Sequence, residues 1–160
     1  MICYWILYMH HLLSFLFVLA ASFLFAKTEI AIEGPNGWAE KLPTWRLPKE
    51  HWASRLVFGG RPATGYHVWL NAFILFSAHA VYLFASFSWS VELRLISLFI
   101  LFWALEDFLW FVLNPAFGLH NFKREKIWWH KDSWWWIAPS AYFIFIPVGV
   151  ALYIASLYIK

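Results

Sequence analysis

Long apolar runs alternate with polar, basic segments along this chain. Three of these runs lack Asp, Glu, Lys and Arg: residues 1–26, 62–91 and 133–159. Each exceeds the ~20 residues that a helix needs to cross the hydrocarbon core of a bilayer. A fourth run, residues 93–113, is long enough as well and is interrupted by Arg94 and by the adjacent acids Glu106 and Asp107. The pattern therefore predicts four membrane-crossing helices.

We predict an all-α integral membrane protein with a single domain, residues 1–160, in which four transmembrane helices form a bundle. The predicted helices cover approximately residues 4–26, 66–88, 92–113 and 134–158. The first run has no basic residue before its apolar part and is longer than the apolar region of a signal peptide, which indicates a retained helix. The two long connections cover residues 27–65 and 114–133, and we refer to them as loops one and three.

Composition supports a membrane location. Hydrophobic residues make up 62% of the chain, aromatic residues 23% and charged residues 13%, whereas roughly 25% of a soluble domain is charged. One cysteine, Cys3, cannot form a disulfide within the chain. The expected partners are membrane lipids, together with a second copy of the chain or another subunit of a membrane complex, and a basic surface facing anionic lipid accounts for the charge without nucleic acid.

The basic residues are distributed very unevenly. Of the 12 Lys and Arg residues, all except Arg94 and Lys160 lie in loops one and three. Because basic loops remain in the cytoplasm, this bias places both loops there and both termini outside the cytoplasm of an inner (plasma) membrane protein.

Loop one is too long for a simple connector. Its first part, "TEIAIE", alternates like a short strand, and Thr64 is positioned to cap the second predicted helix. Tryptophans recur through loop one and in "IWWHKDSWWW" of loop three, so we expect a Trp-rich cytoplasmic cap formed by both loops.

Polar residues within the predicted helices point to a pocket, because an unpaired polar group in hydrocarbon is costly and is retained for a partner or a function. The residues converge on one level, roughly 10 Å or less from the cytoplasmic end. We predict three catalytic candidates: Glu106, Asp107 and His67. We predict five substrate-binding candidates: Asn71, Trp110, Asn114, Arg46 and Tyr142.

Three kinds of chemistry fit these residues. First, a divalent metal could be held by imidazole and carboxylate ligands. The candidate ligands are His67, Glu106, Asp107 and His130. The chain contains no HExxH or ExxH sequence and no cluster of His boxes.

Second, acid/base chemistry on a lipid-like substrate is compatible with Glu106 and Asp107, since two neighbouring carboxyl groups in a low dielectric do not both ionise easily. The segment "ALEDFLWF" resembles the acidic-pair motif of the small heterodimeric carotenoid cyclases, a Pro-x-Glu-Glu followed by Phe-Phe. Here Ala104 replaces the proline and Asp107 the second glutamate, and the rest of the chain does not match that family.

Third, a haem between two helices could take His79 and either His10 or His11 as axial ligands. A purely structural alternative is that an acid pairs with Arg61, Arg94 or a loop lysine and holds the loops on the bundle. The functional classes left open are therefore an enzyme or substrate-binding protein, an accessory subunit of a membrane complex, and a small transporter.

Four sequence blocks cover much of the chain: "IEGPNGWAEKLPTWR", "TGYH", "EDFLWFVLNP" and "IWWHK". They resemble blocks shared by a family of uncharacterised prokaryotic multi-pass membrane proteins of similar size. The resemblance implies a common architecture and assigns no activity. Each block lies on the cytoplasmic side of the predicted topology, so the resemblance implies that residues of the four blocks form one site.

Overall fold

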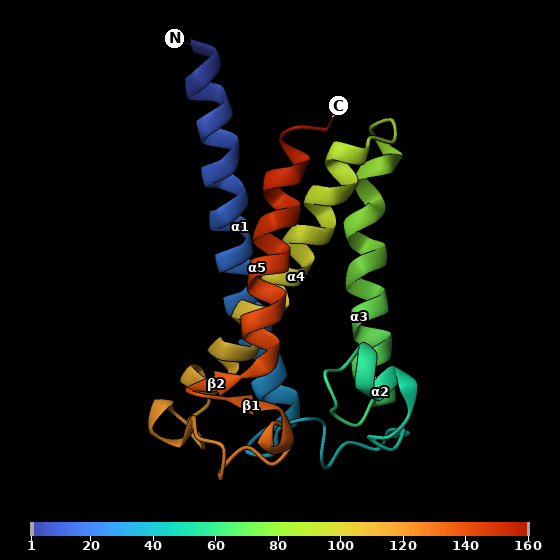
Figure 1. Ribbon diagram of the computed structural model, residues 1–160, viewed down its shortest axis with the longest axis vertical. Coiled ribbons are helices and arrows are strands. Elements are labelled where there is room, and N and C mark those ends of the chain that lie inside the picture. The colour runs from blue at the N-terminus through green and yellow to red at the C-terminus, as the bar shows by residue number, and fades with distance from the viewer. Residues whose placement is uncertain (1, 160) are drawn as a thin grey trace.

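The computed structural model describes the backbone of residues 2–159 and the side chains of residues 9–159. This part of the chain forms five α-helices: α1 (Ile2–Glu33), α2 (Trp52–Leu56), α3 (Gly65–Ala78), α4 (Trp89–Leu113) and α5 (Ser140–Ser156). It also forms three 3-10 helices and one antiparallel hairpin: η1 (His79–Leu83), η2 (Leu119–Asn121), η3 (Lys131–Ser133), β1 (Trp134–Trp135) and β2 (Ala138–Pro139). The four long helices run along the long axis, with both ends of the chain at one end of the molecule and α2, β1 and β2 at the other (Figure 1).

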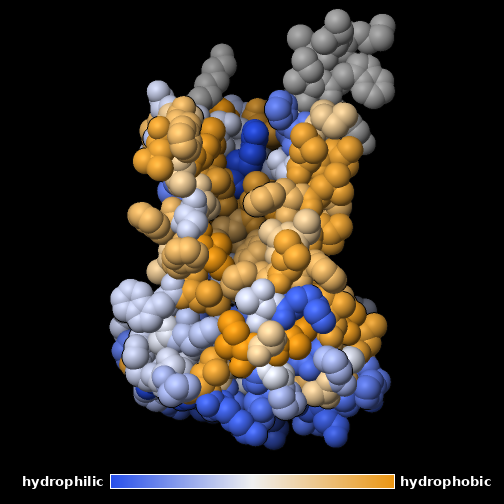
Figure 2. Space-filling model, turned by 180° about the vertical axis from the view of Figure 1, so that it is seen from behind, coloured by the Kyte–Doolittle hydropathy of each residue, from blue (hydrophilic) through white to orange (hydrophobic). Residues whose placement is uncertain are grey.

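Two helices are long and apolar enough to cross a membrane. These are α1, over Met9–Glu33, and α4, over Trp89–Leu113, with 25 residues each. At ~1.5 Å per residue each such segment exceeds the ~30 Å thickness of the hydrocarbon core. The surface agrees with this reading, because hydrophilic residues gather at the end that carries α2 and the hairpin while the helices are covered mainly by apolar ones (Figure 2).

The predicted end of the first helix was wrong. The segment "TEIAIE" continues α1 to Glu33 and does not form a strand. Nothing before Gly34 and Pro35 interrupts the helix, and Gly34 ends it with φ +65° while its amide donates to the carbonyl of Ile30. This extension brings two acidic residues, Glu29 and Glu33, onto one face of α1 because they are four residues apart.

The second and fourth predicted helices also differ from the structure. Helix α3 ends at Ala78 and continues as η1 only to Leu83. Residues 134–139 form the hairpin, and α5 starts after Pro139. A residue before proline avoids the helical conformation, which explains why a helix cannot run through Ala138.

Small residues let α4 pack closely against α1 and α5. The Ser22 hydroxyl of α1 donates to the Phe102 carbonyl, and the Ser97 hydroxyl donates to the Gly149 carbonyl at 2.7 Å. A Cβ atom at Gly149 would lie 2.9 Å from the side chain of Leu101. Such close backbone approach through Gly and Ser is typical of helix pairs in membranes.

Helix α3 stands apart from this packed trio. Its main contacts outside itself are with η1 and loop one, and Figure 1 shows it separated from α5. Three of its large apolar side chains, Trp69, Phe73 and Phe76, are exposed. The packed core of the described residues therefore contains three long helices, and the predicted four-helix bundle is not established.

Loops one and three form the expected Trp-rich cap, which we define as residues 34–64 and 114–139. Trp38 and Trp129 are buried with Trp110 and Phe111 of α4 in one aromatic cluster. The ring of Trp129 stacks on that of Phe111 at 5.9 Å. The cap thus packs onto the end of α4 and closes the bundle there.

Gly37 fixes how closely the two cap loops approach. A Cβ atom at this position would lie 2.2 Å from the indole of Trp129. We expect Gly37→Ala to lower the free energy of unfolding by about 1–3 kcal/mol, as overpacking typically does. Thermal unfolding in detergent, followed by near-ultraviolet circular dichroism, measures this.

The exposed Glu40 of the same loop supplies the control. Its replacement by alanine should change stability by no more than about 0.5 kcal/mol. Equal melting of Gly37→Ala and the unchanged protein would show that the two loops do not meet as described.

Candidate functional site

A polar cavity of about 230 Å³ lies where the four long helices meet the cap. Its walls come from α1, α3, α4, α5 and both cap loops. Four acidic residues line it: Glu29, Glu33, Glu106 and Asp107. Three basic or imidazole side chains also line it: Arg61, His67 and His130. Acidic side chains therefore outnumber permanently charged basic side chains in this cavity. Many of the other lining residues are aromatic.

Asp107 is held by neighbours on several sides. Its Oδ1 lies 3.5 Å from Nη1 of Arg61, and the hydroxyl of Tyr142 on α5 donates to Oδ2. Nε2 of His130 lies 3.6 Å from Oδ2, which is longer than a hydrogen bond. Burial lowers the pKa of His130 below its ordinary value, although Asp107 opposes the shift. Arg61 is therefore the permanent cation that balances Asp107.

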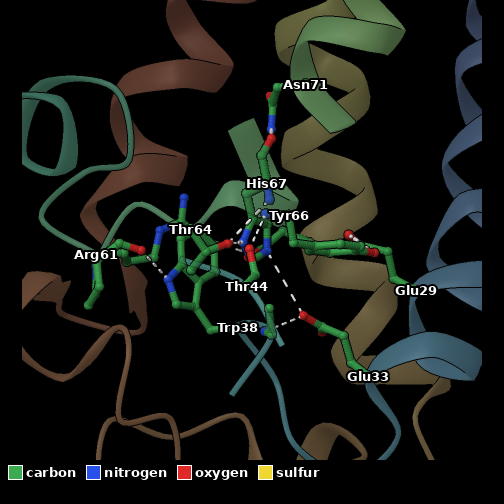
Figure 3. A network of polar contacts seen from close by, with 12 residues as sticks. Glu29, Glu33, Trp38, Thr44, Arg61, Thr64, Tyr66, His67 and Asn71 are labelled. Carbon is green, nitrogen blue, oxygen red and sulfur yellow. Dashed lines mark hydrogen bonds and ion pairs between the residues drawn. The ribbon is translucent and has the colours of Figure 1, made fainter. Parts of the chain in front are cut away.

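Trp38 connects this cation to His67. The guanidinium carbon of Arg61 lies 4.1 Å from the centroid of the Trp38 ring. The His67 ring stacks on the same indole with centroids 4.0 Å apart and an angle of 18° between the planes. The Trp38 indole also donates to the carbonyl of Pro62 at 2.7 Å. Figure 3 shows Trp38 between the two side chains.

The turn that places Trp38 is strained. Trp38 and Ala39 have φ values of 58° and 51°, in the left-handed region that bulky residues rarely adopt. The Ala39 amide donates to the Glu33 carboxylate, and the Arg46 guanidinium donates to the carbonyls of both turn residues. Glu33 and Arg46 thus stabilise a conformation that costs on the order of 1–3 kcal/mol per residue.

His67 is fixed at the first turn of α3. Thr64 caps the helix as predicted, because its hydroxyl accepts from the His67 amide at 3.2 Å. The same hydroxyl lies 2.7 Å from Nδ1 of His67. The other ring nitrogen, Nε2, lies 3.9 Å from Oε1 of Glu33, and His67 is buried. The ring therefore has a fixed orientation with Nε2 directed at α1.

Glu29 and Glu106 form a carboxyl pair between α1 and α4. The Tyr66 hydroxyl of α3 donates to Oε1 of Glu29 at 3.1 Å (Figure 3). Glu106 of α4 lines the same cavity as Glu29, and both side chains are buried. Two buried carboxyl groups that face one space do not both ionise easily, which favours a proton on one of them.

Several buried polar atoms at this site have no hydrogen-bond partner within the described residues. They are Oε1 of Glu106, both ring nitrogens of His130, and the indole nitrogens of Trp103 and Trp110. All four residues line the polar cavity. Unpaired buried polar atoms are rare in folded proteins and call for a partner. Their gathering around one space marks it as a site for a polar molecule.

The structure brings most of the predicted site residues together. Seven of them line the cavity: Glu106, Asp107, His67, Asn71, Trp110, Tyr142 and His130. The Asn71 amide is engaged with the carbonyl of His67 at 2.7 Å. Two predicted substrate-binding residues lie outside the cavity and have structural contacts instead. Arg46 holds the strained turn, and Asn114 donates to the Gly34 carbonyl at 2.9 Å, which ties the end of α4 to the end of α1.

The predicted metal ligands do not form a coordination set. Among the side chains of residues 9–159, no group of three or more His, Cys, Asp and Glu is placed to hold a metal ion. Of the four candidates, His130 and Asp107 approach to 3.6 Å, while His67 faces Glu33. A metal bound here would require these side chains to rearrange.

The histidines considered for haem have other neighbours. Nδ1 of His11 lies 2.7 Å from the Tyr153 hydroxyl on α5. Both ring nitrogens of His79 are engaged, one with the Leu75 carbonyl at 2.6 Å and one with Glu92 at 3.0 Å. His10 is exposed on α1. An axial role for His79 would require one of its hydrogen bonds to break.

The sequence prediction missed two of the four acids at the site. Glu29 and Glu33 were assigned to loop one, because the alternation of "TEIAIE" was interpreted as a short strand. Their spacing of four residues, directly following an apolar helix, was the signal that could have found them. Arg61 was expected near the mouth of the pocket and, in the structural alternative, as a partner of the acidic pair.

Comparison with known proteins finds no relative of this chain. No family model matches the chain, and neither does any curated protein or solved structure. The resemblance to uncharacterised membrane proteins therefore stays a prediction, and the function must be argued from the site.

Proposed function

We propose that this protein is a multi-pass membrane enzyme that performs acid/base chemistry on an amphipathic substrate in the polar cavity. The observation that carries the proposal is Glu106. Its side chain is 2% exposed, its Oε1 has no partner among the described residues, and the carboxyl group of Glu29 lines the same cavity. A buried carboxyl group with an unpaired oxygen, beside a second carboxyl group, is equipped to donate or accept a proton.

Helix lengths support four membrane crossings. α3 and η1 are contiguous, with 14 and 5 residues, and together measure roughly 30 Å. α5 has 17 residues, or about 25 Å, and the hairpin extends it. With the basic cap in the cytoplasm, both termini lie outside and Glu106 lies about 10 Å from the cytoplasmic end of α4.

The acidic neighbours have different roles in this proposal. Asp107 already has a cation and a hydroxyl donor, so it positions Arg61 and Tyr142. Glu106 has neither, and it exchanges the proton with the substrate. His67 is held by Thr64 with Nε2 toward Glu33, where it positions that carboxyl group at the cavity wall.

Two other functions receive less support. A purely structural role would neutralise each acid with one arginine, and this holds for Asp107 but not for Glu106. A transporter would need a polar path to the opposite end of the bundle, where Glu92 contacts His79 and Tyr82. The described cavity does not include these residues.

A hydrophobic carbodiimide tests whether Glu106 or Glu29 carries a proton. The O–H of a carboxylic acid adds across one C=N bond of the reagent, and the adduct rearranges to an N-acylurea that retains every atom of both reactants. We expect peptide mass spectrometry to find the adduct at this pair at neutral pH. Carboxylates exposed to water are ionised and should not react.

Matched variants separate the site from the surface. Glu106→Gln should remove the adduct from α4, whereas Glu125→Gln, in the exposed part of the cap, should leave it unchanged. Labelling that is absent from both Glu29 and Glu106 in the folded protein would contradict the proposal.

A further inference from the structure

A second, apolar groove lies between α1 and α5 and over α4. Its volume is about 620 Å³. The helices α1 and α5 diverge above the cap, as Figure 1 shows. The groove walls include Phe15 and Val18 of α1 and Ile146 and Val150 of α5. Together with the polar cavity, the groove offers a volume within the ~300–1,000 Å³ range of ligand-binding pockets.

The polar groups along this groove are already satisfied. The ring of His11 and the hydroxyl of Tyr153 bond to each other, and the Ser14 hydroxyl donates to a carbonyl of its own helix. The hydroxyl of Tyr142 donates to Asp107. Apart from Nε2 of His11, at the end of the groove far from the cap, the groove therefore presents mainly carbon to a ligand. A hydrocarbon chain is the occupant that matches it.

The groove adjoins the polar cavity. Ala104 and Tyr142 line both spaces, so the two are neighbours at these residues. From Tyr142 to Tyr153 the groove follows α5 for roughly 16 Å. That length is close to half of the ~30 Å hydrocarbon core, which is the depth reached by one lipid chain. A single chain in the groove would thus place its polar head beside the cavity, at Ala104 and Tyr142.

The unpaired polar atoms of the cavity indicate which kind of lipid head group would fit there. The indole nitrogens of Trp103 and Trp110 require acceptors, and Oε1 of Glu106 requires a donor. A hydroxyl group supplies both. Four carboxyl groups against one guanidinium disfavour a phosphate or carboxylate head, because like charges repel strongly where water is excluded.

We infer that the site takes a single-chain lipid with a neutral, hydroxyl-bearing head, its tail between α1 and α5 and its hydroxyl at Glu106. The inference names the substrate class and rests on the proposed function for the chemistry at Glu106. The tail site stands on the groove alone.

Photochemical labelling tests this assignment. The probe is a long-chain primary alcohol with a diazirine near its methyl end, added to the full-length protein in phosphatidylcholine vesicles. Illumination expels N₂, and the carbene inserts into a neighbouring C–H bond. We expect adducts on the groove faces of α1 and α5. Excess unlabelled alcohol should remove them, whereas the phosphate monoester of the same chain should not.

Two tryptophan variants of α5 form a matched pair. Val150 lines the groove, whereas Val148 does not, although both are similarly exposed. Val150→Trp should reduce groove labelling about tenfold, which corresponds to ~1.4 kcal/mol of lost binding. Val148→Trp should leave it unchanged. Ile146→Trp, also in the groove, is the second blocking variant in case Val150→Trp fails to fold.

Each contrary result has a definite meaning. One contrary result is an even spread of adducts over the lipid-facing surface, with equal labelling of Val148→Trp and Val150→Trp. That result would show that the probe behaves as annular lipid only, and it would overturn the tail site. Competition by the phosphate monoester equal to that by the alcohol would overturn the head assignment. Groove labelling without carbodiimide reaction at Glu106 or Glu29 would reject the proposed acid/base function while leaving the lipid site in place.

Discussion

Replacing Arg61 with methionine should destabilise the protein by about 3–5 kcal/mol, because the change leaves the Asp107 carboxylate buried without its cation. Arg61 lies 3.5 Å from Asp107, and both side chains are largely buried. Burial lowers the pKa of Arg61, while Asp107 opposes the shift. The loss should appear as a lower denaturant midpoint in detergent micelles, followed by circular dichroism.

Two further variants isolate the charge effect. Lys49→Met removes the cation of an exposed ion pair, Lys49 with Asp132 at 3.1 Å, and should cost no more than about 1 kcal/mol. Adding Asp107→Asn to Arg61→Met should recover part of the lost stability, because no unbalanced charge remains. An Arg61→Met midpoint equal to that of Lys49→Met would mean that the buried pair does not hold the cap.

Trp129→Ala should be comparably severe. Trp129 is buried against Phe111, Trp110 and Phe117, and Gly37 packs on its indole. Truncation of a buried tryptophan costs about 3–5 kcal/mol through lost burial and a remaining cavity. The thermal midpoint should fall, and limited proteolysis should cut the cap before the helices.

Trp136 provides the comparison within the same loop. Its side chain is 87% exposed, so Trp136→Ala should change the free energy of unfolding by less than about 0.5 kcal/mol. If both variants unfold alike, the aromatic cluster does not organise the cap.

The apolar runs predicted the helical class and the two longest helices. An uninterrupted run of this length has few alternatives to a helix, since every backbone polar group must be satisfied internally. Thr64 was predicted as a cap from its residue type and position, and the structure confirms it. The predicted meeting of Glu106, Asp107 and His67 at one cavity followed from their depths along the helices.

Other features depended on interactions that no local pattern encodes. The alternation in "TEIAIE" fits a strand as well as a helix, and the contacts of Glu29 with Tyr66 and of Glu33 with Ala39 add to the local signal for the helix. The hairpin before α5 required recognition of Pro139 as a helix boundary. Helix periodicity also cannot tell whether α3 packs on its neighbours, because its apolar residues serve a lipid-facing surface equally well.

The pairing of Arg61 with Asp107 also bears on how the chain enters the membrane. An ionised carboxylate within a membrane helix opposes insertion, by up to about 2.5–3.5 kcal/mol when it lies at the helix centre. Asp107 follows Arg61 by 46 residues, so the guanidinium is synthesised first. In the proposed topology, Arg61 therefore lies at the cytoplasmic face before α4 emerges from the ribosome. The order of synthesis thus supplies a counter-charge before it is needed, and α4 can be inserted as part of a pair.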